Sequence, residues 1–550
     1  MGQDRPLSLT RRAFLLGGAA LAGTAAAAAW RRWAWLWPSQ SAFEGEIVGA
    51  SHALGHLLRS GGPFPTPEST RRVAVAVVGG GISGLSAGWK LLRSGLKDFE
   101  VLELEDEAGG TSRHGSGRAG AYPWGAHYLP FPGPEAKAVH ELLGELGVEQ
   151  GRDGHGRPVF NERMVCFAPQ ERLFIHGRWQ EGLFPRLGAS EEDLRQWKAF
   201  EARMAAFRRL RDEHGRPAFA IPMELSSRRA DLLALDRLPM SRWLDDNDFT
   251  SPRVRWLVDY SCRDDFGTTL DQTSAWAGIH YFAGRGEGDQ DQVLTWPEGN
   301  GWLVRKLAEP LGARVKTGAL AYSVAQEADG VRVDYLDART RKAHRLLAKS
   351  AVVCLPQFVA DRIVKGRRGS EKAAAAFSYS PWVVANLTVE DPPPGHGAAP
   401  AWDNVLYRSD SLGYVDAGHQ SLDRRRRESV WTWYLPLAAG DPAAARRAAQ
   451  AASWKDWADR GISDLERAHR GLREKIRRLD VMVWGHAMVR PTPGFLWGGA
   501  REKAARPDGA VFYGHSDLSG FSLFEEAQYR GVKAAEGAMA RLGHPFRSSL

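Results

Sequence analysis

The hydrophobic pattern is clearest between residues 73 and 104. Residues 73–78 read VAVAVV, an apolar and largely β-branched run that is long enough for a parallel strand buried on both faces. A helix is predicted from Ile82 to about Arg93, and a second strand from Phe99 to Leu104. This order predicts the first strand, helix and second strand of a parallel sheet in an α/β domain.

Similar patterns return further along the chain. A helix is predicted from Leu303 to Leu311, and strands are expected on both sides of a turn at Asp329-Gly330 and from Val511 to Tyr513. Ser522-Leu523-Phe524-Glu525 has the S-x-x-E form of a capping box, which predicts a final helix to about Met539. The aromatic-rich segments between these pieces, 136–292 and 381–490, are expected to build a second domain.

The N-terminal apolar run follows a pair of arginines. Thr10 to Leu16 reads Thr-Arg-Arg-Ala-Phe-Leu-Leu, the address of the twin-arginine export route, which carries folded proteins. Residues 27–29 are three alanines and offer a cleavage site. An uncleaved anchor is the alternative, because tryptophans at 30, 33, 35 and 37 suit a membrane interface. We expect the twin-arginine machinery as a partner, a periplasmic or exported location, and membrane contact only through this segment.

Composition and charge narrow the class of protein. The chain has 550 residues, of which 43% are hydrophobic and 25% charged, as in ordinary globular proteins. Its formal net charge of +8 is spread widely, without a basic stripe that carries interleaved aromatics, so no nucleic-acid partner is expected. Cys166, Cys262 and Cys354 are far apart and form no CxxC pair, which argues against a disulfide framework and a cysteine metal site. No metal is expected.

A glycine-rich turn joins the first strand to the helix. Gly79-Gly80-Gly81-Ile82-Ser83-Gly84 matches GxGxxG. Gly79 permits the tight turn, Gly81 lets the backbone approach a pyrophosphate, and Gly84 allows the helix to pack closely on the strand. Glu103 follows 19 residues after Gly84, where a carboxylate accepts hydrogen bonds from the ribose hydroxyls of a dinucleotide. The complete context predicts a bound dinucleotide cofactor.

Three stretches resemble the flavin-containing amine oxidase superfamily, which includes monoamine and polyamine oxidases, protoporphyrinogen oxidase and phytoene desaturases. They are VAVVGGGISGLSAG with VLELEDEAGGTS, WPEGNGWLVRKLAEPLGARVKTGALAYSVAQEADGVRVDYL with AVVCLPQFVADRIV, and GAVFYGHSDLSGFSLFEEAQYRGVKAAEGAM. The resemblance implies a discontinuous Rossmann-type FAD-binding domain with an inserted α+β substrate domain. The expected parts are a signal or anchor (1–37), a linker (38–70), FAD-binding parts (71–135, 293–380, 491–550) and substrate-domain parts (136–292, 381–490).

The resemblance also implies non-covalent FAD, because no cysteine follows Cys354 to attach it. The family usually reads Gly-Gly-Arg at the second glycine turn, whereas this chain has Thr111, with Arg113 two residues later as a substitute. His515 stands where many relatives have an acid, so Asp517 is expected to bind the ribityl chain. The implied cofactor residues are Gly79, Gly81, Gly84, Glu103, Gly109, Gly110, Thr111, Ala321, Val324, Gly514, Asp517, Phe521 and Ser522.

No catalytic base can be identified from the sequence. The candidates for lining the flavin are Trp124, His127, His280, Tyr281, Trp484 and His486. Many amine oxidases carry a lysine near flavin N5, but the matching strand WVVANLTVE has none. The missing lysine leaves room for an electron acceptor other than oxygen, so both remain open. The leading hypothesis is an exported FAD-dependent oxidoreductase that moves a hydride from a small-molecule substrate, an amine in the first place, to flavin N5. The alternatives are a flavin-dependent desaturase, dehydrogenase or isomerase of a large apolar substrate, and a non-catalytic flavoprotein-like scaffold.

Overall fold

The computed structural model describes residues 43–285, 292–367, 375–423 and 427–550. The chain divides into two units after residue 44, and the fold below is that of the second unit, residues 45–550. The predicted signal or anchor, residues 1–37, lies outside the described residues. Within the described ranges, no helix is both long enough and apolar enough to span a membrane.

A seven-stranded sheet carries the glycine-rich turn. Its order is β12-β3-β2-β15-β14-β13, with β21 also paired to β15. The bounds are β2 (Ser69–Val78), β3 (Phe99–Leu102), β12 (Val315–Lys316), β13 (Ala319–Glu327), β14 (Gly330–Asp337), β15 (Ala343–Val353) and β21 (Val511–Tyr513). β12, β3, β2, β15 and β21 pair in parallel, and β14 pairs antiparallel with both β13 and β15.

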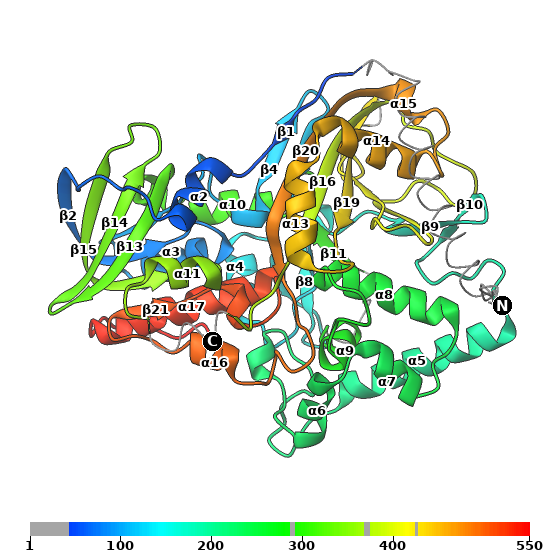
Figure 1. The fold of residues 1–550 in the computed structure, drawn as a ribbon. Coiled ribbons are helices and arrows are strands. Elements are labelled where there is room, and N and C mark those ends of the chain that lie inside the picture. The colour runs from blue at the N-terminus through cyan, green and yellow to red at the C-terminus, as the bar shows by residue number, and fades with distance from the viewer. Residues whose placement is uncertain (1–42, 286–291, 368–374, 424–426) are drawn as a thin grey trace, which may run out of the picture. The chain divides into compact units, whose positions relative to one another are not determined.

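The first βα unit forms because its strand is apolar throughout and its turn is made of glycine. Val75, Val77 and Val78 of β2 are buried, and α3 runs from Ile82 to Arg93 as predicted. The C-terminal helix α17 (Phe524–Arg541) packs beside α3, so that a Cβ on Gly531 would come within 2.0 Å of the Ser83 carbonyl oxygen. Figure 1 shows this helix in red below the blue and green strands. The fold confirms the expected Rossmann-type FAD-binding domain.

An eight-stranded mixed sheet forms the second part of this unit. Its order is β1-β20-β16-β19-β18-β17-β9-β10. The bounds are β1 (Ile47–Val48), β9 (Glu171–Ile175), β10 (Arg178–Glu181), β16 (Tyr379–Glu390), β17 (Asp403–Leu406), β18 (Tyr414–Asp416), β19 (Glu428–Pro436) and β20 (Ile476–Val489). Apolar residues on both faces of β16 are buried, which makes it a central strand that links the sheet to the layers around it.

Two groups of helices accompany this second sheet: the first lies below it in the view of Figure 1, and the second packs on β16 and β20. One group is α5 (Glu191–Arg209), α6 (Ala230–Ala234), α7 (Met240–Asp246), α8 (Pro252–Phe266) and α9 (Ala275–Ala283); another is α13 (Pro442–Ala451), α14 (Trp454–Leu465) and α15 (Leu472–Lys475). The remaining elements are α2 (His52–Ser60), β4 (His114–Gly117), β5 (Gly120–Pro123), β6 (Tyr128–Pro130), α4 (Lys137–Glu145), β7 (Glu149–Arg152), β8 (Pro158–Phe160), β11 (Val293–Thr295), α10 (Gly301–Ala308), α11 (Gln357–Ile363) and α16 (Ala500–Ala504).

Several element ends differ from the sequence-based expectation. β3 ends at Leu102 and α10 ends at Ala308, so both are shorter than the hydrophobic runs that predicted them. The predicted capping box was wrong: α17 begins after Leu523 and has no side-chain cap. Ser522 instead accepts a hydrogen bond from the Val489 N–H at 3.2 Å, because the start of α17 lies against the end of β20.

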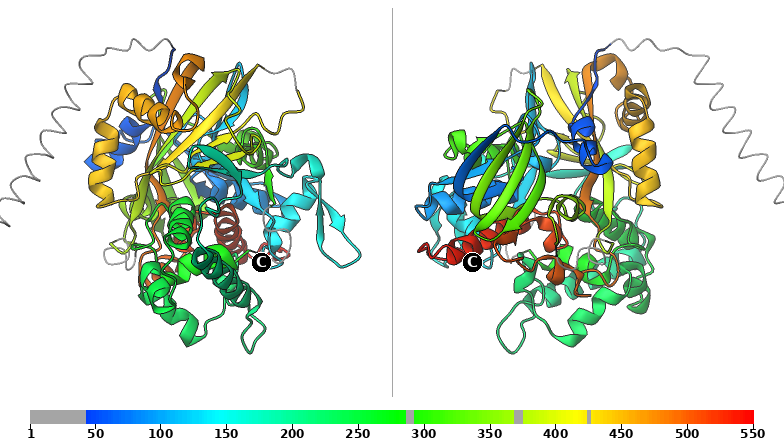
Figure 2. Two further views of the ribbon diagram at one scale, coloured as in Figure 1. Left: turned by 90° about the vertical axis from the view of Figure 1, so that its right-hand side faces the viewer. Right: turned by 60° about the vertical axis from the view of Figure 1, so that its left-hand side comes forward.

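The segment expected to be a linker contains ordered elements. β1 pairs in parallel with β20, and α2 follows it directly. In Figure 1 and in the right-hand view of Figure 2, α2 (blue) lies between the two sheets. The segment that precedes β2 therefore contributes to the region where the sheets meet.

Candidate active site

A cavity of about 440 Å³ lies where the two glycine turns meet the C-terminal segment. Gly79 has φ +104°, and a Cβ there would lie 2.5 Å from the Cys354 carbonyl oxygen, so only glycine fits. Gly81 faces the cavity and has no atom within 3.9 Å of its Cβ position. Its backbone bridges to Gly109, which places the two glycine turns side by side. The cavity wall is therefore bare backbone where a pyrophosphate would bind.

Glu103 is fixed at the wall of this cavity. Its side chain accepts hydrogen bonds from the Gly80 N–H at 2.7 Å and the Glu105 N–H at 2.9 Å. Burial raises the pKa of Glu103, although these two N–H groups act in the opposite direction. The carboxyl group retains acceptor sites that face the cavity, where ribose hydroxyls can donate to it.

The second glycine turn supplies a buried cation. Arg113 is 7% exposed and lines the cavity, with Nη1 3.6 Å from Glu105 Oε2 and the guanidinium 5.7 Å from the centre of the Trp484 ring. Thr111, which stands where the family usually has arginine, also lines the cavity. Arg113 thus provides positive charge beside the turn, in the position expected from the sequence.

Asp517 joins the C-terminal segment to the neighbouring elements. Its side chain accepts hydrogen bonds from the Tyr379 hydroxyl at 2.5 Å and the Gln357 N–H at 2.9 Å, and pairs with His515 at 3.1 Å. Burial acts to raise the pKa of Asp517, but His515, Tyr379 and Gln357 outweigh it and lower the pKa. This anionic side chain lines the cavity, as a group that binds a ribityl hydroxyl must.

Most of the predicted cofactor residues come together here. Those that line the cavity are Gly79, Gly81, Glu103, Gly109, Gly110, Thr111, Ala321, Asp517 and Ser522. Gly84, Val324, Gly514 and Phe521 do not line it. Gly84 packs against the first strand's end, where a Cβ would lie 1.8 Å from the Gly79 carbonyl oxygen. The Gly514 carbonyl accepts from Ser83 Oγ, the Val324 carbonyl accepts from the Lys365 N–H at 2.8 Å, and Phe521 stacks on His280 at 4.7 Å.

A second cavity, of about 130 Å³, adjoins the first. The two share the lining residues Thr111, Ala126, Trp484, Ala487, Ser522, Leu523 and Phe524. Its other walls are largely aromatic, including His127, Tyr128, Trp382 and Tyr434. A small molecule in this cavity would lie directly beside a ligand that fills the larger one, so the smaller cavity is the candidate substrate site.

His127 stands on the aromatic wall of the substrate cavity. Its ring stacks on Tyr434 at 4.7 Å, and Nδ1 lies 3.3 Å from the Gly125 carbonyl oxygen. Burial lowers the pKa of His127 to about 4, although the contact with Gly125 opposes this, so the ring is neutral near pH 7. Because Nδ1 carries the proton donated to Gly125, Nε2 is an acceptor, and it has no partner in the described part of the chain.

Acidic groups line another part of the substrate cavity. Arg285 Nη2 lies 3.1 Å from both carboxylate oxygens of Asp265. Burial and the charge of Asp265 raise the pKa of Asp264 to about 7, against the effect of Arg285. Burial also raises the pKa of Glu525 to about 7, against its own backbone N–H and Arg285. The sequence analysis missed Asp264, Asp265 and Arg285, and it assigned Glu525 to a helix cap.

The remaining catalytic candidates occupy three different environments. Trp124 is buried and its carbonyl accepts from the Trp484 indole N–H at 2.7 Å, which orients Trp484 in the cavity wall. His486 lines the cofactor cavity and stacks on Phe358 at 4.2 Å. His280 and Tyr281 line neither cavity; His280 contacts the Ala220 carbonyl at 2.9 Å, and burial lowers its pKa to about 4.

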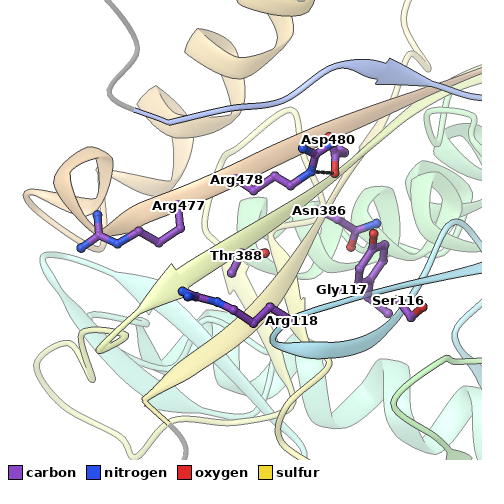
Figure 3. Close-up of a pocket in the computed structure, with 9 residues that line it drawn as sticks. Ser116, Gly117, Arg118, Asn386, Thr388, Arg477, Arg478 and Asp480 are labelled. Atoms are coloured by element: carbon purple, nitrogen blue, oxygen red, sulfur yellow. Dashed lines mark hydrogen bonds and ion pairs between the residues drawn. The ribbon is translucent and has the colours of Figure 1, made fainter.

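A third cavity, of about 310 Å³, lies under the β4–β5 hairpin beside β16 and β20 (Figure 3). Three arginines line it, and each has an acidic partner. Arg118 pairs with Glu428, Arg477 pairs with Glu390, and Arg478 Nε lies 2.6 Å from Asp480. These charges are matched, and the cavity shares no lining residue with the two cavities described above, so it is separate from the active site.

Comparisons with known proteins agree with this site. The family model described as flavin containing amine oxidoreductase matches residues 82–536, and the chain belongs to that family. It is therefore an FAD-dependent oxidoreductase with an amine oxidase-type fold. A tryptophan 2-monooxygenase of Pantoea agglomerans pv. gypsophilae is 36% identical over 126 residues, which make up 21% of this chain and 20% of that protein.

Solved structures share the fold at low sequence identity. A putrescine oxidase variant has a TM-score of 0.64 and 16% identity, covering 86% of this chain and 100% of its own. A cyclohexylamine oxidase from Brevibacterium oxydans IH-35A has a TM-score of 0.61 and 16% identity, covering 86% and 99%. A fatty acid isomerase from P. acnes has a TM-score of 0.59 and 14% identity, covering 85% and 98%. These likenesses concern the fold.

Proposed function

We propose that this protein oxidises a small amine held in the 130 Å³ cavity. The observation that carries the proposal is the junction of the two cavities, where Thr111, Trp484 and Leu523 line both. Bound FAD supplies a hydride acceptor at its N5 atom. The substrate carbon next to nitrogen gives up a hydride and the nitrogen gives up a proton, which leaves an imine that water can hydrolyse.

The residues of the larger cavity fit FAD. The Gly79–Gly81 turn leaves room for the pyrophosphate, and Glu103 can accept from ribose hydroxyls. The first turn of α17, whose Phe524 and Ala527 line the cavity, brings the positive end of the helix dipole to it. That end of the helix favours the negative charge of a reduced flavin.

The aromatic wall orients the amine and excludes water. Trp484 is held by its hydrogen bond to Trp124, and His127 is held between Gly125 and Tyr434. Only a neutral amine has the lone pair that assists hydride loss, so an ammonium must first lose a proton. We propose that the amine binds in its neutral form and that His127 Nε2, which has no other partner in the described part of the chain, accepts a hydrogen bond from the amine N–H and orients it.

The small volume disfavours the alternative of a large apolar substrate. A cavity of about 130 Å³ is near the size of engineered protein cavities of about 150 Å³ that bind benzene. Among the described residues, no lysine lines either cavity. The electron acceptor is therefore open between oxygen and another molecule, and readmitting air after flavin reduction distinguishes the two.

We further propose that the protein reaches the periplasm by the twin-arginine route with FAD already bound. The Thr10–Leu16 sequence supports the route, and a cofactor that must be inserted before export gives a reason for it.

The visible absorption spectrum of the purified protein tests the proposed function. Anaerobic addition of a small amine should bleach the bound flavin, and readmitted air will show whether oxygen restores it. A flavin that no amine reduces would contradict the proposal.

A further inference from the structure

The charges around the substrate cavity do not balance. Asp264, Asp265 and Glu525 line it, and Arg285 is the one lysine or arginine among the described residues that do so. Arg285 is paired with Asp265 at 3.1 Å, which neutralises one of the three carboxylates. Neither Asp264 nor Glu525 has an ion pair with any residue that the structure describes. Two acidic groups are therefore available to a ligand.

Glu525 is the clearest of these groups. The residue is only 4% exposed, lines the cavity, and receives no hydrogen bond from any other residue within the described ranges. Leaving a carboxylate buried without a partner is costly, and burial accordingly raises the pKa of Glu525 to about 7. A bound cation would offset this cost.

Asp264 is surrounded by further acids. Besides burial and Asp265, the charge of Glu171 on β9 raises the pKa of Asp264. Burial and the charges of Glu171 and Asp264 raise the pKa of Asp403 on the neighbouring strand β17. The described residues contain no group of His, Cys, Asp and Glu side chains arranged to hold a metal ion. An organic cation is therefore the ligand that this part of the cavity fits.

The two ends of the cavity differ in chemistry. Trp484 and Leu523 adjoin the cofactor cavity, whereas Asp264 and Asp265 line only the substrate cavity. An amine nitrogen that reacts beside the flavin would leave the acidic groups for a second nitrogen. A volume of about 130 Å³ suits roughly the six non-hydrogen atoms of benzene, and hence a short chain.

We infer that the substrate is a short aliphatic diamine, an inference that rests on the proposed amine oxidation. Its second, protonated nitrogen is bound by Asp264 and Glu525. The carboxylates act as specificity-determining residues for this nitrogen. An amino acid is disfavoured, because Arg285, the one arginine or lysine that lines the cavity within the described ranges, is already paired with Asp265. A monoamine lacks the group that the acids would bind.

Two amines of the same length test the inference. Putrescine carries a second ammonium, and n-pentylamine has a methyl group in its place. Anaerobic stopped-flow measurements give the rate constant of flavin reduction divided by the substrate dissociation constant for each amine. We expect the holoenzyme to favour putrescine by tenfold or more, because a charge-assisted contact to a buried carboxylate is lost with the methyl group.

Variants identify the residues responsible. Asp264→Asn and Glu525→Gln should each reduce the preference for putrescine by about tenfold. Asp329→Asn, which removes a charge from the exposed β13–β14 turn, is the matched control and should leave the ratio unchanged. The circular dichroism spectrum and FAD content of each variant show that it has folded and is loaded.

The outcomes separate this inference from the proposed function. If n-pentylamine reduces the flavin as well as putrescine does, or if neither variant alters the ratio, the diamine inference is wrong and amine oxidation stands. If neither amine reduces the flavin, the proposed amine oxidation is contradicted. Calorimetric titration with putrescine then tests diamine binding by itself. Binding that Asp264→Asn weakens would support diamine recognition, and no binding would overturn it.

Discussion

The guanidinium of Arg285 lies 3.1 Å from both carboxylate oxygens of Asp265. This pair uses Arg285, the one lysine or arginine that lines the substrate cavity among the described residues, and leaves the adjacent Asp264 without an ion-pair partner in that part of the chain. The cavity therefore has an acidic part and an aromatic part.

Replacing Gly81 should abolish FAD binding without unfolding the protein. Gly81 has an extended backbone with φ −71° and ψ −177°, which valine adopts readily, and the nearest atom to its Cβ position is 3.9 Å away. Gly81→Val would place a side chain where the pyrophosphate binds. We expect a colourless protein with an unchanged circular dichroism spectrum, whereas Gly144→Ala in the exposed part of α4 should remain yellow. A Gly81→Val protein with normal flavin content would contradict this account of the turn.

Glu103→Gln should weaken FAD binding by about tenfold, because a neutral amide accepts weaker hydrogen bonds than a carboxylate from Gly80, Glu105 and the ribose. Fluorescence titration of the apoprotein with FAD measures the dissociation constant. Glu107→Gln, at an exposed position in the same loop, is the control. Equal affinities of the two variants would show that Glu103 has no part in binding.

His127→Phe should weaken amine binding by about tenfold and leave FAD binding intact. Phenylalanine retains the stacking on Tyr434 but has no Nε2 to accept a hydrogen bond from the amine. Because burial lowers the pKa of His127 to about 4, the loss should be the same at pH 7 and pH 9. Anaerobic stopped-flow measurements give the amine dissociation constant, and His155→Phe, in an exposed loop, is the control. An unchanged dissociation constant would assign His127 a packing role.

The stability of the protein should depend on Asp264 in a defined pH window. Burial and Asp265 raise the pKa of Asp264 in the folded state to about 7, against about 3.9 in an unfolded chain. An acid whose folded pKa is raised destabilises the fold as the pH rises from about 4 to about 7, and the penalty is complete above that range. Glu171, Arg263 and Arg285 also act on this group.

Asp264→Asn should consequently raise the melting temperature at pH 8 relative to the natural protein, and the gain should shrink towards pH 4. Thermal unfolding across this range, without amine, measures it. A variant that is equally destabilised at pH 4 and pH 8 would show that the carboxylate has a structural partner.

Export depends on the arginine pair in our proposal. Replacing both Arg11 and Arg12 by lysine should hold the protein in the cytoplasm with FAD bound. Cell fractionation with flavin analysis measures both properties. Unchanged appearance in the periplasm would exclude the twin-arginine route.

Local sequence patterns predicted the strand, turn and helix that border the larger cavity. The apolar strand, glycine turn and α3 are specified by consecutive residues, and Glu103 follows at a fixed spacing. Such features depend on backbone conformation within one βα unit, so they are visible in the sequence.

The substrate cavity depends on contacts between residues that are far apart in the sequence, so local patterns did not predict it. Asp264 and Glu525 come from α8 and α17, and only the tertiary fold brings both to the substrate cavity. Ser522 matched a capping box, yet its hydroxyl bonds to the end of β20, because a tertiary contact replaced the local one. The helix α2, whose His52 and His56 line the cofactor cavity, lies in a segment that composition alone indicated as a linker.

The most direct test of the central claim is the visible spectrum of the purified protein before and after anaerobic addition of putrescine. We predict a bound-flavin spectrum that bleaches on addition of the diamine. A colourless protein that takes up no FAD, or a flavin that neither putrescine nor any other small amine reduces, would contradict the account.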